Sequence, residues 1–236
     1  MLEYLRNKKL MIVVAHPDDE LLGLGATINK LVNEFNVKTH VVILGEGLTS
    51  RLEKRDTNKL KKELIIHKKN IKNAQKSIGY HNNSIYDFPD NRFDSVSILD
   101  IIKVVEKEKK IFQPEVIFTH HGGDLNIDHQ LTFEAVITAC RPMKNEIVKT
   151  IFTFETPSST EWKSPTNPHH FLPNIFISVS ESNINSKIKG MESYEFEKRK
   201  FPHPRSPEAL KIQAKRWGVI NGVDYAEAFC LIRLIN

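Results

Sequence analysis

The stretch Val13-Val14-Ala15-His16-Pro17-Asp18-Asp19-Glu20 indicates both the fold and a candidate site. It continues an apolar run, Leu10–Val14, that is typical of a buried β-strand. It precedes Leu21–Phe35, where apolar residues recur at helical spacing. The order of strand, sharp loop and helix places one histidine and two aspartates at the carboxyl end of a first strand, where open α/β sheets carry their sites.

The side chains of this loop suit a metal ion, although a simpler interpretation exists. An imidazole and two carboxylates within four residues can hold a hard or borderline divalent ion and leave one carboxylate free. Alternatively, Asp18 or Asp19 caps the following helix by accepting backbone N–H bonds. The second aspartate and a later histidine-rich segment, Thr119–His129, favour the metal interpretation.

Strands and helices alternate along the chain through residue 155. The expected strands are Leu10–Val14, Lys38–Leu44, Ser84–Phe88, Pro114–Thr119 and Thr150–Glu155. The expected helices are Leu21–Phe35, Arg51–Ile78, Ser97–Glu108 and Asp128–Cys140. This alternation predicts an α/β fold with a Rossmann-like, mostly parallel sheet and helices on both of its faces.

The remainder of the chain is less regular and reads as a C-terminal elaboration of the same domain. A loop rich in Ser, Thr, Pro and His spans Pro157–Pro173. The elements expected after it are a strand at Asn174–Val179, helices at Asn183–Lys200 and Ser206–Trp217, and a strand at Tyr225–Ile235. We therefore expect one domain over residues 1–236.

Composition limits the class of protein. The 236 residues are 40% hydrophobic, which suits a globular core. No apolar run approaches the roughly 20 residues of a membrane helix, and the start lacks the apolar segment of a signal peptide. We therefore expect no membrane span and a cytoplasmic location. The two cysteines, Cys140 and Cys230, form no disulfide framework and read as small buried hydrophobes.

A net charge of +5 raises the question of a nucleic-acid partner. The lysines concentrate in Arg51–Lys76 and Lys103–Lys110, where Glu and Asp are interleaved, as on a solvated helix face. No interleaved aromatic residues suit base stacking. We therefore expect no nucleic acid, and the excess charge could instead attract an anionic substrate such as a nucleotide-linked sugar.

The chain resembles the LmbE/PIG-L family of zinc-dependent de-N-acetylases. The resemblance rests first on Ala15–Glu20 and on Asp128-His129, which closes a loop after a central strand. It extends to Gly45–Gly47, Phe88–Arg92 and Pro202–Ser206, so it covers most of the chain. It implies a hydrolase that removes the N-acetyl group from an N-acetylglucosamine-like substrate, which could be linked to a nucleotide or a carrier.

The same resemblance assigns roles to the two motifs. It implies that His16, Asp19 and His129 bind zinc and that Asp18 is the general base. Three protein ligands that leave one position open are typical of catalytic zinc, although such a set also accepts Fe²⁺ or Co²⁺. The neighbouring carboxylate can then take the proton of an attacking water.

The second motif departs from much of the family. Many members have His-Pro-Asp-His, whereas this chain has Asn126-Ile127-Asp128-His129. Asn126 can donate a hydrogen bond but cannot act as a general acid. The candidates for the acid are protonated Asp18, His120, His121 and His203. His120 and His121 could instead orient a ligand, and Asp128 could be a partner of a metal-binding histidine.

The substrate pocket is expected to gather polar side chains from several loops. These are Glu46, Arg51, Asp90, Asn91, Arg92, Asn126 and Trp162. A simple β-turn after Pro89 is an alternative reading of residues 90–92, because Asp and Asn favour turns. Likewise, His203 could reach the site or brace it from the rigid Pro202–Ser206 motif.

Two other functions are compatible with these residues. One is an amidase acting on another small N-acyl substrate, and the other is a non-catalytic carbohydrate-binding protein of the same fold. The second carboxylate beside the proposed ligand disfavours a binding protein, which would not need it. The sequence leaves the oligomeric state open, a homo-oligomer included.

Overall fold

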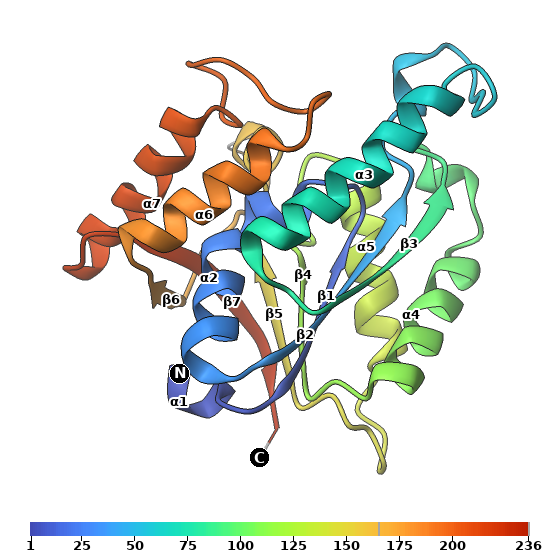
Figure 1. Cartoon of the computed structure of the whole chain (residues 1–236). Helices are drawn as coiled ribbons and strands as arrows, with labels where there is room; N and C mark the ends of the chain where they lie inside the picture. The colour runs from blue at the N-terminus through green and yellow to red at the C-terminus, as the bar shows by residue number, and fades with distance from the viewer. Residues whose placement is uncertain (165, 236) are drawn as a thin grey trace.

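The computed structural model describes residues 1–164 and 166–235 and contains a seven-stranded sheet in the order β3-β2-β1-β4-β5-β7-β6 (Figure 1). The strands are β1 (Lys9–Val14), β2 (Lys38–Gly45), β3 (Asn82–Phe88), β4 (Val116–His120), β5 (Thr150–Phe154), β6 (Ile175–Ser178) and β7 (Ala226–Leu234). Strands β1 to β5 pair in parallel, whereas β7 is antiparallel to both β5 and β6. The predicted α/β fold with a mostly parallel sheet is therefore confirmed.

Helices cover both faces of this sheet (Figure 1). They are α1 (Leu2–Leu5), α2 (Asp19–Phe35), α3 (Lys61–Ile78), α4 (Ile98–Phe112), α5 (Ile127–Ala139), α6 (Glu181–Glu192) and α7 (Pro207–Asn221). Alternate side chains of β1 explain the two cores. Leu10 and Ile12 pack on the side of α2, α3, α6 and α7, and Met11 and Val13 pack on the side of α4 and α5.

The central strand β1 pairs with β2 on one side and β4 on the other. The strand order therefore reverses between β1 and β4, and open α/β sheets bind ligands outside the carboxyl ends of the strands at such a point. The loops that follow β1 and β4 carry the two histidine-containing motifs.

Four helix boundaries differ by four residues or more from the sequence-based prediction. Helix α4 ends at Phe112 rather than Glu108, and α7 ends at Asn221 rather than Trp217, because the left-handed residues that cap them are Gln113 and Gly222. Helix α3 begins at Lys61 rather than Arg51, because the segment before it lacks an apolar stripe and Arg51 ends a short 3₁₀ turn, Thr49–Arg51. Helix α6 ends at Glu192 rather than Lys200. Beyond it the chain forms a separate turn, in which the carbonyl of Tyr194 accepts the N–H groups of Glu197 and Lys198.

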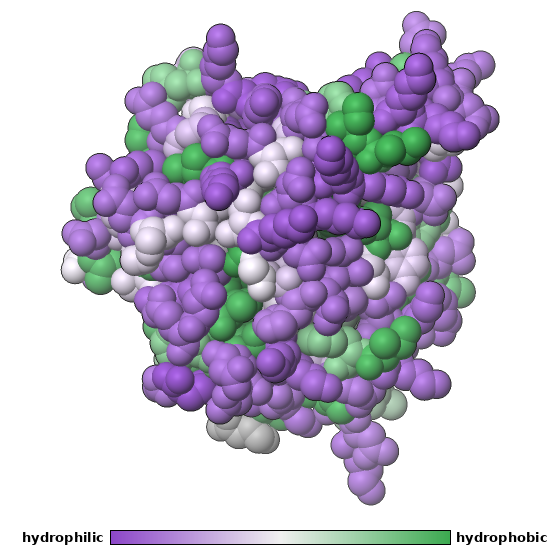
Figure 2. All heavy atoms as spheres, viewed as in Figure 1, coloured by the Kyte–Doolittle hydropathy of each residue, from purple (hydrophilic) through white to green (hydrophobic). Residues whose placement is uncertain are grey.

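Other predictions about the scaffold hold within the described residues. Most of the face that Figure 2 shows is hydrophilic, in keeping with lysine-rich helix faces exposed to solvent. Both cysteines are free thiols in buried positions. No helix in the described part of the chain is both long and apolar enough to cross a membrane. The loop expected at 157–173 contains a 3₁₀ turn, Thr160–Trp162, and its residue 165 lies outside the described residues.

Candidate active site

A polar cavity of about 260 Å³ lies at the carboxyl ends of β1 and β4. Many of the residues expected from the sequence line it: His16, Asp18, Asp19, Arg51, Asp90, Asn91, Asn126, His129, Trp162 and His203. These residues come from separate loops of the chain, and the fold brings them to one edge of the sheet. Ser50, Ser158, Glu197, Arg199 and Arg205 also contribute to its wall.

The loop between β1 and α2 turns sharply at Asp18. This residue has φ of 101°, in the left-handed region, and its side chain makes no capping hydrogen bond to α2. Asp19 accepts the backbone N–H of His16 at 2.8 Å, which folds the loop back on itself. The helix-cap interpretation of Asp18 is therefore wrong, and its carboxylate faces the cavity instead.

His16, Asp19 and His129 converge as the sequence suggested. The Oδ2 atom of Asp19 lies 3.3 Å from Nδ1 of His16 and 3.4 Å from Nε2 of His129. The three buried residues offer ligand atoms that all lie within 4.8 Å of one another. Two imidazoles and one carboxylate with this spacing are a donor set that zinc and similar divalent ions use.

Each of the two histidines has a carboxylate close to one of its ring nitrogens. Asp128 Oδ2 lies 2.9 Å from His16 Nε2, and Asp124 Oδ1 lies 3.1 Å from His129 Nδ1. Such partners orient metal-binding imidazoles and select the tautomer. Asp128 thus occupies the position proposed for it, whereas Asp124 was missed, although it lies in the same histidine-rich segment.

The neighbouring carboxylates favour the protonated, positively charged form of His129. Burial opposes protonation of His129, but the carboxylates of Asp19 and Asp124 outweigh it and raise its pKa to about 9. Burial also opposes ionisation of Asp19, yet His129 holds the pKa of that carboxyl well below its usual range. A site that stabilises a proton in this way without a metal can release it when a cation binds.

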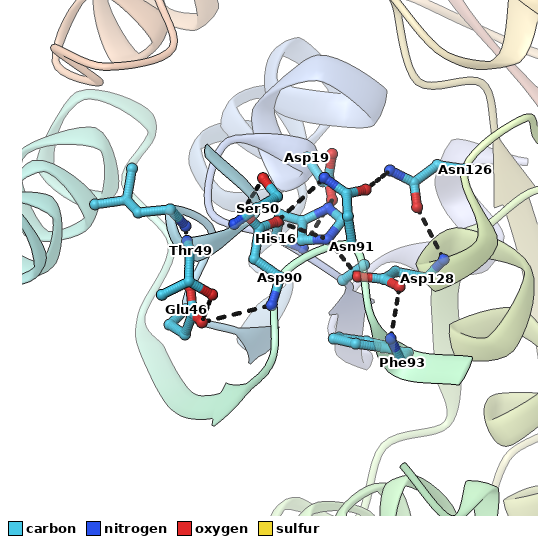
Figure 3. A network of polar contacts seen from close by, with 12 residues as sticks. His16, Asp19, Glu46, Thr49, Ser50, Asp90, Asn91, Phe93, Asn126 and Asp128 are labelled. Atoms are coloured by element: carbon cyan, nitrogen blue, oxygen red, sulfur yellow. Dashed lines mark hydrogen bonds and ion pairs between the residues drawn. The ribbon is translucent and has the colours of Figure 1, made fainter. Parts of the chain in front are cut away.

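A second group of potential ligands, His16, Asp90 and Asp128, shares one histidine with the first. In Figure 3 the Asp128 carboxylate lies between His16 and the backbone of Phe93, whose N–H it accepts at 2.9 Å. Asp128 is fully buried and is absent from the cavity lining. The first group faces the cavity with all three residues, so it is the better candidate for a catalytic ion.

His120, the last residue of β4, and the following His121 lie outside the cavity lining. His120 Nε2 accepts the N–H of Ala15 at 3.0 Å, so its proton is assigned to Nδ1, which lies 3.1 Å from Thr156 Oγ1. Burial lowers the pKa of His120 to about 4, and its ring stacks on that of His129 at 3.9 Å. His121 bonds to the carbonyl of His169.

The polar residues after β3 and β4 form a connected wall of the cavity, as Figure 3 shows. Asn126 caps α5 by accepting the N–H of Asp128 and donates to Asn91 Oδ1 at 2.6 Å. Asp90 accepts a hydrogen bond from the hydroxyl of Ser50 at 2.5 Å. The N–H of Arg92 donates to the carbonyl of Pro89, so this segment is a turn, and two of its residues, Asp90 and Asn91, line the cavity.

Two residues expected in the pocket are placed elsewhere. Glu46 accepts the N–H groups of Leu48 and Thr49 and supports the loop after β2. The guanidinium of Arg92 donates to the carbonyls of Leu52 and Glu53. Neither belongs to the lining of the cavity.

The C-terminal region supplies an ion-pair network that the sequence analysis missed. Arg205 Nη1 donates to Asp18 Oδ2 at 2.9 Å and to Glu197 Oε2 at 2.8 Å. Arg51 donates to the other oxygen of Glu197. Burial raises the pKa of Asp18, and the charge of Arg205 opposes that increase. Arg205 lies inside the Pro202–Ser206 motif, and this motif was the feature of the sequence that could have pointed to it.

A protein-family model described as "PIG-L: GlcNAc-PI de-N-acetylase" matches residues 11–140, more than half of the chain. Among curated proteins, an uncharacterized deacetylase, YaiS of Escherichia coli K12, is 28% identical over 196 residues. That alignment covers 80% of this chain and 91% of the relative.

Solved structures share the fold at low sequence identity. The N,N'-diacetylchitobiose deacetylase of Pyrococcus horikoshii has a TM-score of 0.70 at 19% identity, covering 98% of this chain and 88% of its own. GalB of Pseudomonas putida KT2440, a 4-carboxy-2-hydroxymuconate hydratase, has a TM-score of 0.73 at 20% identity. The match covers 97% of this chain and 98% of GalB. The same fold therefore hosts different reactions, and the chemistry has to be argued from the site.

Proposed function

Because this chain belongs to the PIG-L family of GlcNAc-PI de-N-acetylases, we propose that it hydrolyses the N-acetyl group of an amino-sugar substrate with a zinc ion and an aspartate base. The family resemblance expected from the sequence and the enzyme class, a hydrolytic N-deacetylase, are confirmed. The observation that carries the finer proposal is a carboxylate, Asp18, that faces the cavity beside the three candidate ligands.

The residues of the proposed metal site fit a divalent ion. His129 is 2% exposed, and its Nε2 has no hydrogen-bond partner among the described residues. That nitrogen faces Asp19, and His16 Nδ1 faces the same carboxylate. We assign zinc to His16, Asp19 and His129, a set that Fe²⁺ or Co²⁺ can also occupy. The bound ion would supply Lewis acidity, which activates water and polarises the amide carbonyl.

The proposed chemistry of the side chains follows from their positions. Asp18 accepts a proton from the water that attacks the acetamide carbonyl. It then delivers that proton to the departing nitrogen as the C–N bond breaks, which gives a free amine and acetic acid, and the acid ionises to acetate. Asp18 takes both roles because Asn126 cannot supply a proton.

A histidine of the C-terminal region can assist this transfer. His203 lines the cavity, and its Nδ1 accepts the N–H of Arg205 at 3.1 Å. Its proton is therefore assigned to Nε2, which makes this nitrogen a hydrogen-bond donor. We place His203 as a donor to the substrate, with Asn91 and Asn126 from the loops after β3 and β4 as further polar contacts.

The test is acetate release from a panel of N-acetylated sugars and nucleotide-linked sugars, with and without a chelator. We expect release from at least one sugar, loss of activity on chelation and recovery with added Zn²⁺. Release only from N-acyl compounds without a sugar would replace the proposal with an amidase. Full activity in chelator after the metal content has been shown to be zero would exclude the metal mechanism.

A further inference from the structure

Asp18, the proposed base, has a backbone conformation that residues other than glycine rarely adopt. Its φ of 101° lies in the left-handed region. Its carbonyl accepts the N–H groups of Leu21 and Leu22, both at 2.9 Å, in the first turn of α2. Its own N–H donates to Oε2 of Glu20, in the first turn of the same helix, at 3.0 Å. Such a conformation persists only where the surroundings hold it.

Glu20, which accepts this N–H, is bonded in turn to Tyr194, far away in the sequence. Glu20 is fully buried, and its second carboxylate oxygen, Oε1, accepts the hydroxyl of Tyr194 at 2.6 Å. Tyr194 is also fully buried and lies two residues beyond the end of α6. The catalytic loop is thus joined to the C-terminal region through a buried chain, Asp18–Glu20–Tyr194.

The turn that contains Tyr194 is also connected to the side chain of Asp18. The N–H of Glu197 donates to the carbonyl of Tyr194 at 3.0 Å, so the two residues belong to one turn. Glu197 accepts from Arg205, which donates to the carboxylate of Asp18. One turn therefore supports the backbone of Asp18 through Tyr194 and its side chain through Glu197.

We propose that Glu20 and Tyr194 are positioning residues that hold the backbone of Asp18 so that its carboxylate faces the reacting water. The proposal rests on the function assigned to Asp18 above. The direction of a short side chain follows from its backbone, so loosening the N–H of Asp18 would let the carboxylate move. A displacement of about 1 Å at a catalytic group can cost about 10²-fold in rate.

Tyr194→Phe is the primary test, because it removes the hydroxyl and keeps the buried ring. We expect kcat to fall about 10-fold, with KM and metal content unchanged. Tyr80→Phe is the matched control: Tyr80 is 2% exposed and its hydroxyl has no hydrogen-bond partner in the described part of the chain. We expect kinetics close to wild type in this variant, since no bond to the catalytic loop is lost.

Two variants of Glu20 separate positioning from packing. Glu20→Gln can still accept the N–H of Asp18 and donate to the Tyr194 hydroxyl, so it should retain most activity. Glu20→Leu cannot do either, and its kcat should fall at least as far as that of Tyr194→Phe. A loss in the Gln variant as large as that in the Leu variant would show that these two hydrogen bonds do not sustain activity, and would overturn the proposal.

Hydrogen exchange of the Asp18 amide, measured by NMR, gives a readout that needs no substrate. It should be faster in Tyr194→Phe than in wild type and unchanged in Tyr80→Phe. Unchanged exchange together with wild-type kcat in Tyr194→Phe would overturn the positioning role. A wild-type protein that releases no acetate from any substrate would overturn the proposed function instead, and the exchange measurement would still decide whether Tyr194 holds the loop.

Discussion

The parallel part of the sheet and the antiparallel C-terminal part contribute differently to the site. The three candidate ligands follow β1 and β4, in the parallel part. Arg205 contacts the Asp18 carboxylate, and Glu197 pairs with Arg205. Both line the cavity and come from the segments around α6 and α7. Different regions therefore supply the proposed metal ligands and the side-chain partners of the proposed base, so mutations should separate the two functions.

The largest effect is expected in the parallel part. His129→Ala should remove the bound metal and reduce deacetylation below detection, because one of three protein ligands is lost. Metal analysis of the purified variant measures this directly. Cys140→Ser, at the end of the same helix, should keep about one equivalent per chain. Full metal occupancy in His129→Ala would remove this histidine from the site.

Asp18→Asn tests the residue at which the two regions meet. The amide keeps the size of the side chain but cannot take a proton, so kcat should fall by about 10²–10⁴-fold. Metal content and KM should stay near wild type, because the carboxylate is not among the proposed ligands. Deacetylation at a near wild-type rate would contradict the mechanism even if zinc were present.

A smaller effect is expected when only the C-terminal support is changed. Arg205→Gln removes the charge that pairs with Asp18 and Glu197, and we expect kcat to fall about 10-fold with metal retained. Arg205→Lys keeps the charge and should recover part of the loss. Arg216→Gln on α7, whose guanidinium lies over Trp217, is the control. Loss of metal in Arg205→Gln would show that the two regions are not separable.

The smallest effects concern two arginines expected to bind the substrate. Arg51 lines the cavity and pairs with Glu197, so Arg51→Ala should raise KM about 5-fold, equivalent to about 1 kcal/mol. Arg92 donates to the carbonyls of Leu52 and Glu53, so Arg92→Ala should change KM less than about 2-fold. Steady-state kinetics on one substrate measure both. A larger KM effect for Arg92 would reverse this assignment.

Local patterns were sufficient for much of the scaffold. Five parallel strands and the helices between them follow from runs of apolar residues with the period of each element. The ends of α3 and α6 were predicted less well. Before α3 the chain forms a 3₁₀ turn, and after α6 it forms a turn closed on the carbonyl of Tyr194, so in both places a polar segment that reads as helical folds differently.

The candidate ligands could be named from the sequence because each lies beside a strand end within a short motif. The sequence by itself determined which donors are available and that parallel strands bring their carboxyl ends to one edge. Only the tertiary structure decided that Asp124 stands behind His129, that Arg92 turns away, and that Tyr194 and Arg205 hold Asp18. Asp124 and His129 belong to one short segment, but the other contacts join residues 40 to 187 positions apart, so they depend on how distant elements pack together and not on any local period.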